Sequence, residues 1–170
     1  CIRDSRYTDI HLSQLAQRLR SGFLGHVSTA IIEACEITDD GRIYLTAGVG
    51  VTPTVARLAD RIIVELNAAH SKNLIGMHDL YEMERPPYRR PIPIVRPSDR
   101  IGLPYIQVDP SKIVGVVEVN IPDEARGFHD SDPVTDKIGQ NVAEFLAADM
   151  RRGVIPSTFL PLQSGVGNIA

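Results

Sequence analysis

The sequence predicts an α/β fold, with a mostly parallel sheet flanked by helices. Two observations carry this prediction. Short apolar runs rich in β-branched residues alternate along the chain with amphipathic segments of helical period, and turn residues separate them. The length of 170 residues, with 43% hydrophobic and 23% charged residues, suits one domain with a packed core.

The first third of the chain predicts a helix followed by a hairpin. Apolar residues recur at helical spacing over residues 11–20, and a Ser-Gly pair then ends the segment. Residues 27–34 form a short, nearly uncharged run, typical of a buried strand. Residues 39–41 read Asp-Asp-Gly, a turn signal, so residues 42–46 are expected to return as the second strand of a hairpin.

The middle of the chain predicts a short helix, a strand and a long loop. Thr52 is expected to cap a helix that has Pro53 at its first position. The helix leads into a strand over residues 61–67. Residues 84–100 hold five prolines and five arginines, a composition that favours an extended, polyproline-like loop.

The last third predicts two strands and a helix. Residues 105–108 and 113–121 are expected to be strands, and the second has the apolar density of a central strand. Asp132 and Pro133 start a helix that runs through Arg152, where Gly153 closes it.

Charge and composition exclude several classes of protein. A net charge of −3 removes the general electrostatic case for nucleic acid. Cys1 and Cys35 are too few for a disulfide framework, and no apolar run reaches the roughly 18–20 residues of a membrane span. We therefore predict a cytoplasmic protein with neither nucleic acid nor membrane as partner. The start at Cys1 and the end on a glycine-rich turn suggest a piece of a longer polypeptide.

The polar residue pattern offers several weak candidates for chemistry. Cys1 could be an N-terminal nucleophile, but exposure by truncation or proteolysis explains it better, because nothing after it forms the strand that such an enzyme needs. Cys35 fits a buried small hydrophobe. The five histidines show no metal-ligand spacing, so no metal is predicted. His78 beside Asp79 could be an oriented acid-base pair or a simple turn contact.

Two loops could bind ligands. Residues 48–50 read Gly-Val-Gly between a predicted strand and a predicted helix, which suits either a tight turn or a loop lining a cleft. The arginines of residues 84–100 could bind an acidic ligand, lie in solvent, or belong to an arm that docks on another subunit.

The stretch Gln163-Ser164-Gly165-Val166-Gly167-Asn168-Ile169 is the most specific in the chain. Two glycines on either side of Val166 allow the backbone to approach a ligand closely, as a site made of main-chain N–H donors requires. On local grounds a plain glycine turn remains the alternative.

The whole chain resembles the acetyl-CoA hydrolases and succinyl-CoA:acetate CoA-transferases, of the class I CoA-transferase type. The resemblance rests on motifs in a fixed order: DIHLSQ (9–14), LRSG (19–22), AIIEA (30–34), TPT (52–54), ADRIIVELN (59–67), GMHDLY (76–81), DRIGLP (99–104), VDPSKI (108–113) and LQSGVGNIA (162–170).

The resemblance implies a NagB/RpiA/CoA-transferase-like fold and an enzyme that transfers CoA between an acyl-CoA and a carboxylate, or hydrolyses acetyl-CoA. Residues 1–155 would be the later part of the N-terminal domain, and residues 156–170 the turn leading to the catalytic part. Coenzyme A is implied as substrate, with a small carboxylate, the remainder of the polypeptide and a second copy as partners.

The resemblance also implies site residues. The Val166 backbone would lie at the thioester oxygen, with Asn168 close by as a second catalytic residue. The CoA-binding set would be Gln163, Ser164, Gly165, Val166, Gly167, Asn168 and Ile169. The family's nucleophilic glutamate follows this turn, and none of the eight glutamates at positions 33, 36, 65, 82, 84, 118, 124 and 144 matches it. The isolated chain is therefore expected to be inactive. A non-catalytic α/β ligand-binding or assembly module is the alternative.

Overall fold

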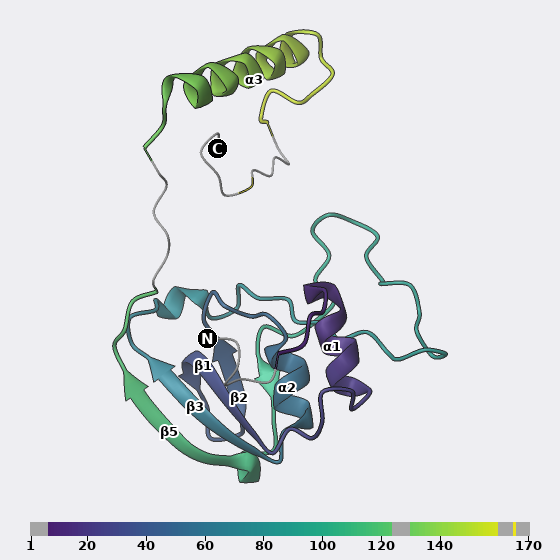
Figure 1. The fold of residues 1–170 in the computed structure, drawn as a ribbon, viewed down its shortest axis with the longest axis vertical. Coiled ribbons are helices and arrows are strands. Elements are labelled where there is room, and N and C mark those ends of the chain that lie inside the picture. Colours follow the sequence, from purple (N-terminus) through teal and green to yellow (C-terminus); the bar gives the residue numbers. More distant parts are fainter. Residues whose placement is uncertain (1–6, 124–129, 160–164, 166–170) are drawn as a thin grey trace. The chain divides into compact units, whose positions relative to one another are not determined.

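A computed structural model of the chain describes residues 7–123, 130–159 and 165. These residues fall into two compact units, Cys1–Pro122 and Asp123–Ala170, which are described separately below (Figure 1). Among the described residues, no helix is both long and apolar enough to span a bilayer.

The first unit is built on a five-stranded mixed sheet with the order β4-β2-β1-β3-β5. The strands are β1 (Thr29–Ile37), β2 (Arg42–Leu45), β3 (Arg61–Asn67), β4 (Ile106–Gln107) and β5 (Ile113–Val119). β3 pairs in parallel with both β1 and β5, whereas β2 runs antiparallel to β1 and β4. Four of these five described strands therefore point the same way, which confirms the predicted α/β class with a mostly parallel sheet.

Two helices, α1 (Leu12–Arg20) and α2 (Thr52–Leu58), accompany this sheet, and α2 contacts both α1 and β1 (Figure 1). Two 3₁₀ turns, η2 (Lys72–Leu74) and η3 (Pro110–Lys112), complete the unit. The prediction that Thr52 caps α2 is wrong. Thr52 is the first helical residue, and the cap position belongs to Val51, whose side chain has no group to accept the N–H hydrogen bonds.

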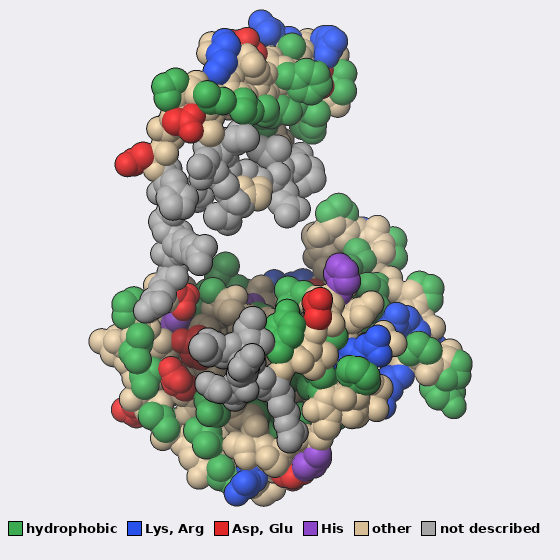
Figure 2. Space-filling view, in the orientation of Figure 1, with side chains coloured by type: hydrophobic (Ala, Val, Ile, Leu, Met, Phe, Trp, Pro, Cys, Tyr) green, Lys and Arg blue, Asp and Glu red, His purple; other side chains and the backbone are tan. Residues whose placement is uncertain are grey.

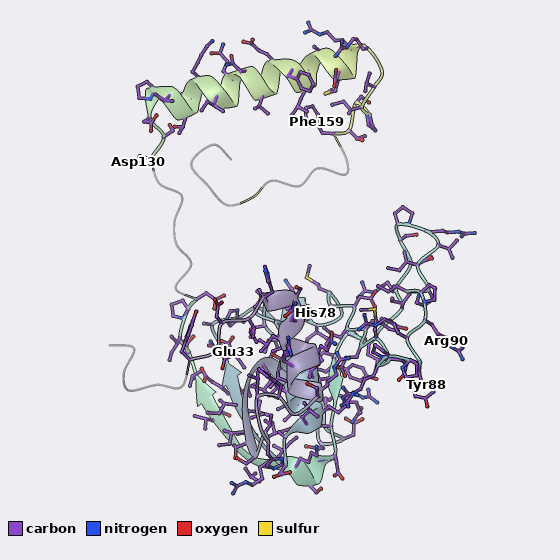
Figure 3. The ribbon with its side chains drawn as sticks, turned by 45° about the vertical axis from the view of Figure 1, so that its right-hand side comes forward. Glu33, His78, Tyr88, Arg90, Asp130 and Phe159 are labelled. Carbon is purple, nitrogen blue, oxygen red and sulfur yellow. The ribbon has the colours of Figure 1, made fainter. Side chains whose placement is uncertain are left out.

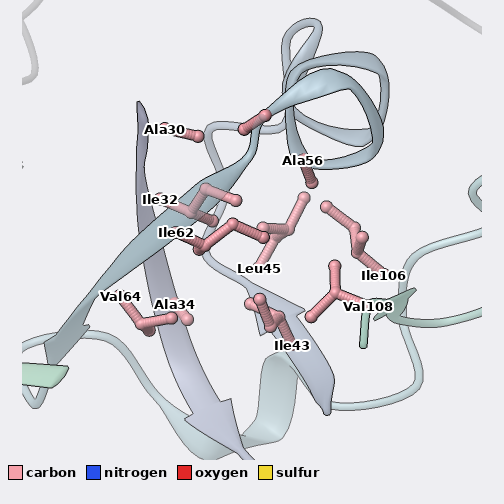
Figure 4. Close-up of a cluster of buried hydrophobic side chains, with 11 residues drawn as sticks. Ala30, Ile32, Ala34, Ile43, Leu45, Ala56, Ile62, Val64, Ile106 and Val108 are labelled. Atoms are coloured by element: carbon pink, nitrogen blue, oxygen red, sulfur yellow. The ribbon is translucent and has the colours of Figure 1, made fainter. Parts of the chain in front are cut away.

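Alternate residues of the strands point toward α2 and form the core (Figure 4). Ile32, Ile43, Leu45, Ile62 and Val64 are the largest fully buried apolar side chains. Ala56 in α2 and Ala59, the residue that follows the helix, have small buried side chains that let α2 lie close to the sheet. The apolar alternation of the strand residues thus fixes which face of the sheet carries the helices.

β5 differs from its prediction as a central strand. It lies at the edge of the described sheet, paired on one side with β3. Val114, Val116 and Val117 are about half exposed, at 56%, 47% and 51%. Its apolar composition predicts that both faces of β5 pack against other elements. Among the described residues, neither a further strand nor a helix packs against it.

The second unit holds the helix α3 (Pro133–Arg151), whose predicted start and end are confirmed. The Asp132 carboxylate accepts hydrogen bonds from the backbone N–H groups of Val134 and Thr135, and the Thr135 hydroxyl accepts one from the Asp132 N–H. This reciprocal capping box satisfies the first donors of the helix. The apolar side chains of Ile138, Val142 and Phe145 on α3 are exposed within the described residues.

Candidate functional site

A polar cluster, formed by Glu33, Thr46 and Asn67, lies near the carboxyl ends of β1 and β3, the edge at which parallel α/β sheets usually bind ligands. Figure 3 labels Glu33 within the first unit. One oxygen of the Glu33 carboxylate accepts a 2.7 Å hydrogen bond from the Asn67 side-chain amide, and the other accepts one of 2.7 Å from the Thr46 hydroxyl. Since Thr46 directly follows β2, the carboxylate joins three neighbouring strands.

The Asn67 side chain is almost fully buried and uses both ends of its amide. Its NH₂ group also donates to the Ile121 carbonyl at 2.8 Å, and its oxygen accepts from the N–H groups of Ala69 and Ile121, each at 3.1 Å. The amide therefore links the end of β3 to the segment that follows β5, with full use of its hydrogen-bonding groups.

The charge of Glu33 is stabilised in place. Burial raises the pKa of the carboxyl, but the hydrogen bonds from Asn67 and Thr46 and the adjacent His70 outweigh burial and hold the pKa below its usual value. His70 Nε2 lies 3.2 Å from the carboxylate. A half-buried carboxylate that stays ionised can position neighbouring groups. It is a weak base, because hydrogen bonds largely occupy its lone pairs and its pKa is low.

His78 and Asp79 do not form the acid-base pair that the sequence left open. His78 Nε2 lies 3.0 Å from the Thr46 carbonyl and 3.2 Å from the Leu45 carbonyl, at the end of β2. The Asp79 carboxylate instead accepts hydrogen bonds from the backbone N–H groups of Ile101 and Gly102. Both residues thus hold backbone segments in position, and Asp79 does so as a turn contact.

Two other weak candidates have structural roles. Cys35 is buried, with Sγ 3.6 Å from the Leu45 carbonyl, and burial raises the pKa of its thiol, which confirms the expectation of a buried small hydrophobe. Gly50 adopts a φ of 48°, as a tight turn requires, and a side chain at Gly48 would meet no atom within 4 Å. The tight-turn interpretation accounts for residues 48–50, and a role in lining a cleft stays a prediction.

The prediction that residues 84–100 form a loop is confirmed, because they contain neither helix nor strand. The loop, called the arm below, projects from the first unit and carries Tyr88 and Arg90 (Figure 3). Its base is closed by reciprocal backbone hydrogen bonds of 2.8 and 3.1 Å between Leu80 and Leu103. Gly102 permits this close approach, since a Cβ there would lie 2.2 Å from the Leu80 oxygen.

Of the predicted CoA-binding residues, the structure describes one. Gly165 is exposed, and a Cβ added to it would meet no atom within 4 Å. Gln163, Ser164, Val166, Gly167, Asn168 and Ile169 lie outside the described residues, as does Cys1. Their roles stay predictions.

Sequence reasoning missed the polar cluster. A glutamate inside an apolar strand and an asparagine at the end of a later strand were the available signals, because buried polar groups of this kind need partners. The spacing of Glu33, Thr46 and Asn67 along the chain gave no sign that they meet.

Comparison with known proteins agrees with the motifs. The family model of the acetyl-CoA hydrolase/transferase N-terminal domain matches residues 4–118. The propanoyl-CoA:succinate CoA transferase of Escherichia coli is 43% identical over 163 residues, 96% of this chain and 33% of that protein. The succinyl-CoA:acetate CoA-transferase of Clostridium kluyveri is 41% identical over 97% of this chain and 31% of its own length. The acetyl-CoA hydrolase of Schizosaccharomyces pombe is 40% identical over 97% and 33%.

A likeness among solved structures supports the fold alone. The E249D mutant of RipA superposes with a TM-score of 0.50 at 16% identity, covering 82% of this chain and 25% of RipA. The chain spans about a third of the length of the curated relatives it matches. With the family model matched over residues 4–118, this chain belongs to the acetyl-CoA hydrolase/transferase family and carries sequence of that family's N-terminal domain.

Proposed function

We propose that this chain is part of an enzyme that transfers CoA between an acyl-CoA and a small carboxylate, or hydrolyses acetyl-CoA. The observation that carries the proposal is the 40–43% identity, over nearly the whole chain, to two CoA-transferases and an acetyl-CoA hydrolase. Both reactions break the same thioester bond and differ in whether a carboxylate or water receives the acyl group.

The proposed reaction passes through a glutamyl-CoA thioester. A glutamate carboxylate attacks the acyl carbon, the C–S bond breaks, and CoA leaves as its thiolate. The acyl group then remains on the glutamate as a mixed anhydride. The thiolate then attacks the glutamyl carbonyl and releases the acyl group as a free carboxylate. A second carboxylate reverses these steps to give a new acyl-CoA, whereas attack by water on an acyl intermediate completes hydrolysis.

We place the nucleophile outside these 170 residues. Three described glutamates are engaged elsewhere: Glu33 in the polar cluster, Glu36 in a 2.6 Å ion pair with Lys72, and Glu82 between Arg20 and Arg57. Residues 1–155 would then support the fold of the N-terminal domain, and residues 156–170 would lead to the catalytic part. The isolated chain would lack turnover.

In this proposal the glycine turn Gly165-Val166-Gly167 provides backbone N–H donors for the developing oxyanion of the thioester, and Asn168 lies beside it. Fixed donors of this kind each contribute about 10²–10³ in rate. Gln163, Ser164 and Ile169 would complete the contact with CoA. The cytoplasmic location and the homo-oligomer expected from the sequence stay predictions.

The test uses the full-length protein. We expect propanoyl-, succinyl- or acetyl-CoA plus a carboxylate to give a new acyl-CoA, or acetyl-CoA alone to release free thiol. Mass spectrometry of the enzyme mixed with acyl-CoA alone should find CoA linked to one glutamate, and borohydride should abolish activity by reducing that thioester. The absence of both turnover and adduct would favour a non-catalytic module.

A further inference from the structure

A cavity of about 240 Å³ lies where the arm meets the C-terminal turn of α1. Six residues line it: Gln17, Arg20, Ser21, Arg85, Pro86 and Arg89. Three of these carry guanidinium groups, two more carry neutral hydrogen-bonding side chains, and none is acidic. Figure 2 shows Lys and Arg side chains gathering on this side of the first unit. The polar cluster described above contributes no residue to this cavity.

Arg20 is fixed and still has a donor to spare. Its guanidinium donates to the Met83 carbonyl at 3.0 Å and to the Thr54 hydroxyl at 3.2 Å, and it pairs with Glu82 at 3.4 Å. The side chain is 13% exposed. Its Nε is buried and has no hydrogen-bond partner among the described residues. These contacts hold the positively charged guanidinium of Arg20 at the cavity wall, where its charge attracts an anion.

Arg85 and Arg89 complete the cavity from the arm. Within the described residues, neither side chain makes a hydrogen bond or an ion pair. The backbone between them is held by a 2.8 Å hydrogen bond from the Tyr88 N–H to the Arg85 carbonyl. The Glu82 carboxylate is shared between Arg20 and Arg57, which lies 3.3 Å away, so it is already engaged with two cations.

The C-terminal end of α1 does not need Arg85 or Arg89 to satisfy its carbonyl groups or to complement its dipole. The carbonyls of Gln17, Arg18 and Leu19 accept hydrogen bonds from the N–H groups of Ser21, Phe23 and Gly22. Arg18 in the same last turn, with its guanidinium 4.9 Å from the Phe23 ring, complements the helix dipole. Arg85 and Arg89 are therefore available for an external ligand.

We propose that this cavity binds a phosphate group. A phosphate presents several oxygens, which can accept from three guanidinium groups together, whereas one guanidinium already satisfies a monocarboxylate. Free phosphate or pyrophosphate would be one source. The phosphates of CoA would be another, and that assignment alone rests on the proposed function. Phosphate binding itself does not require any acyl transfer.

The test measures binding of pyrophosphate and of CoA to the full-length protein by calorimetry at constant ionic strength. Arg85→Ala and Arg89→Ala should each weaken pyrophosphate binding at least about tenfold, the loss expected for one charge-assisted hydrogen bond. Arg90→Ala is the matched control, since it removes the same charge from the same arm outside the cavity. Melting temperatures of the three variants should agree, because all three side chains are exposed.

Two comparisons identify the source of the phosphate. If CoA supplies it, Arg85→Ala raises the KM for an acyl-CoA and leaves the KM for the matching acyl-pantetheine unchanged. If free phosphate is the ligand, the variants lose pyrophosphate binding while the KM for acyl-CoA stays constant. The full-length enzyme could be active while Arg85→Ala and Arg89→Ala change neither pyrophosphate binding nor the KM for acyl-CoA. That result overturns the phosphate site and leaves the proposed function intact. An equal loss in Arg90→Ala also overturns it, because general electrostatics would then explain the binding.

Discussion

Replacing Asn67 with alanine tests the polar cluster at the carboxyl ends of the strands. The substitution removes one hydrogen bond to the ionised Glu33 and three to backbone groups of Ile121 and Ala69. A bond to a charged group contributes about 1.5–3 kcal/mol and each neutral bond about 1 kcal/mol. Water entering the space vacated by the amide recovers part of this, so we expect a loss of about 3 kcal/mol in the free energy of unfolding.

Urea denaturation followed by circular dichroism measures this loss, and hydrogen exchange locates it. The Ala69 and Ile121 amides should exchange faster in Asn67→Ala because the side-chain oxygen that accepts from them is gone. Asn73→Ala is the control, since Asn73 is exposed and should change stability by less than about 0.5 kcal/mol. A loss below about 1 kcal/mol in Asn67→Ala, with both amides still protected, would refute this account of the cluster.

Three further predictions concern the cluster, the arm and the glycine turn. The pKa of Glu33 is lower in the folded state, so its ionised form stabilises the fold above the ordinary carboxyl pKa of 4.5, and this stability is lost as pH falls through the lower folded value. The difference in unfolding free energy between the wild type and Glu33→Gln should therefore shrink on acidification. Urea titrations at several pH values measure it. Gly102→Ala should lower stability by about 1–3 kcal/mol, because its methyl group would overlap the Leu80 backbone, while Gly48→Ala, with open space, should cost less; equal melting temperatures would contradict this. Gly167→Ala in the full-length enzyme should lower kcat far more than the melting temperature, and normal turnover per folded molecule with a lower melting temperature would assign the glycine to the turn alone.

The sequence determined the local elements and the family. The bounds of β3 follow from its apolar run, and those of α3 follow from the cap at Asp132 and the stop at Gly153. These signals act within a few residues along the chain. The hairpin turn at Gly41, with its φ of 82°, was equally readable. Ordered motifs over the whole length identified the family before any contact was known, because a family likeness is a property of the sequence itself.

Only the tertiary structure decided which distant residues meet. Glu33 and Asn67 are 34 positions apart, and Arg20 and Arg85 come from a helix and a loop with no shared motif. The structure also corrected β5 from a central to an edge strand, since composition records how much apolar surface a strand carries and not which neighbours cover it. Side-chain clusters of this kind depend on strand order and on the path of the arm, and no local pattern encodes either of them.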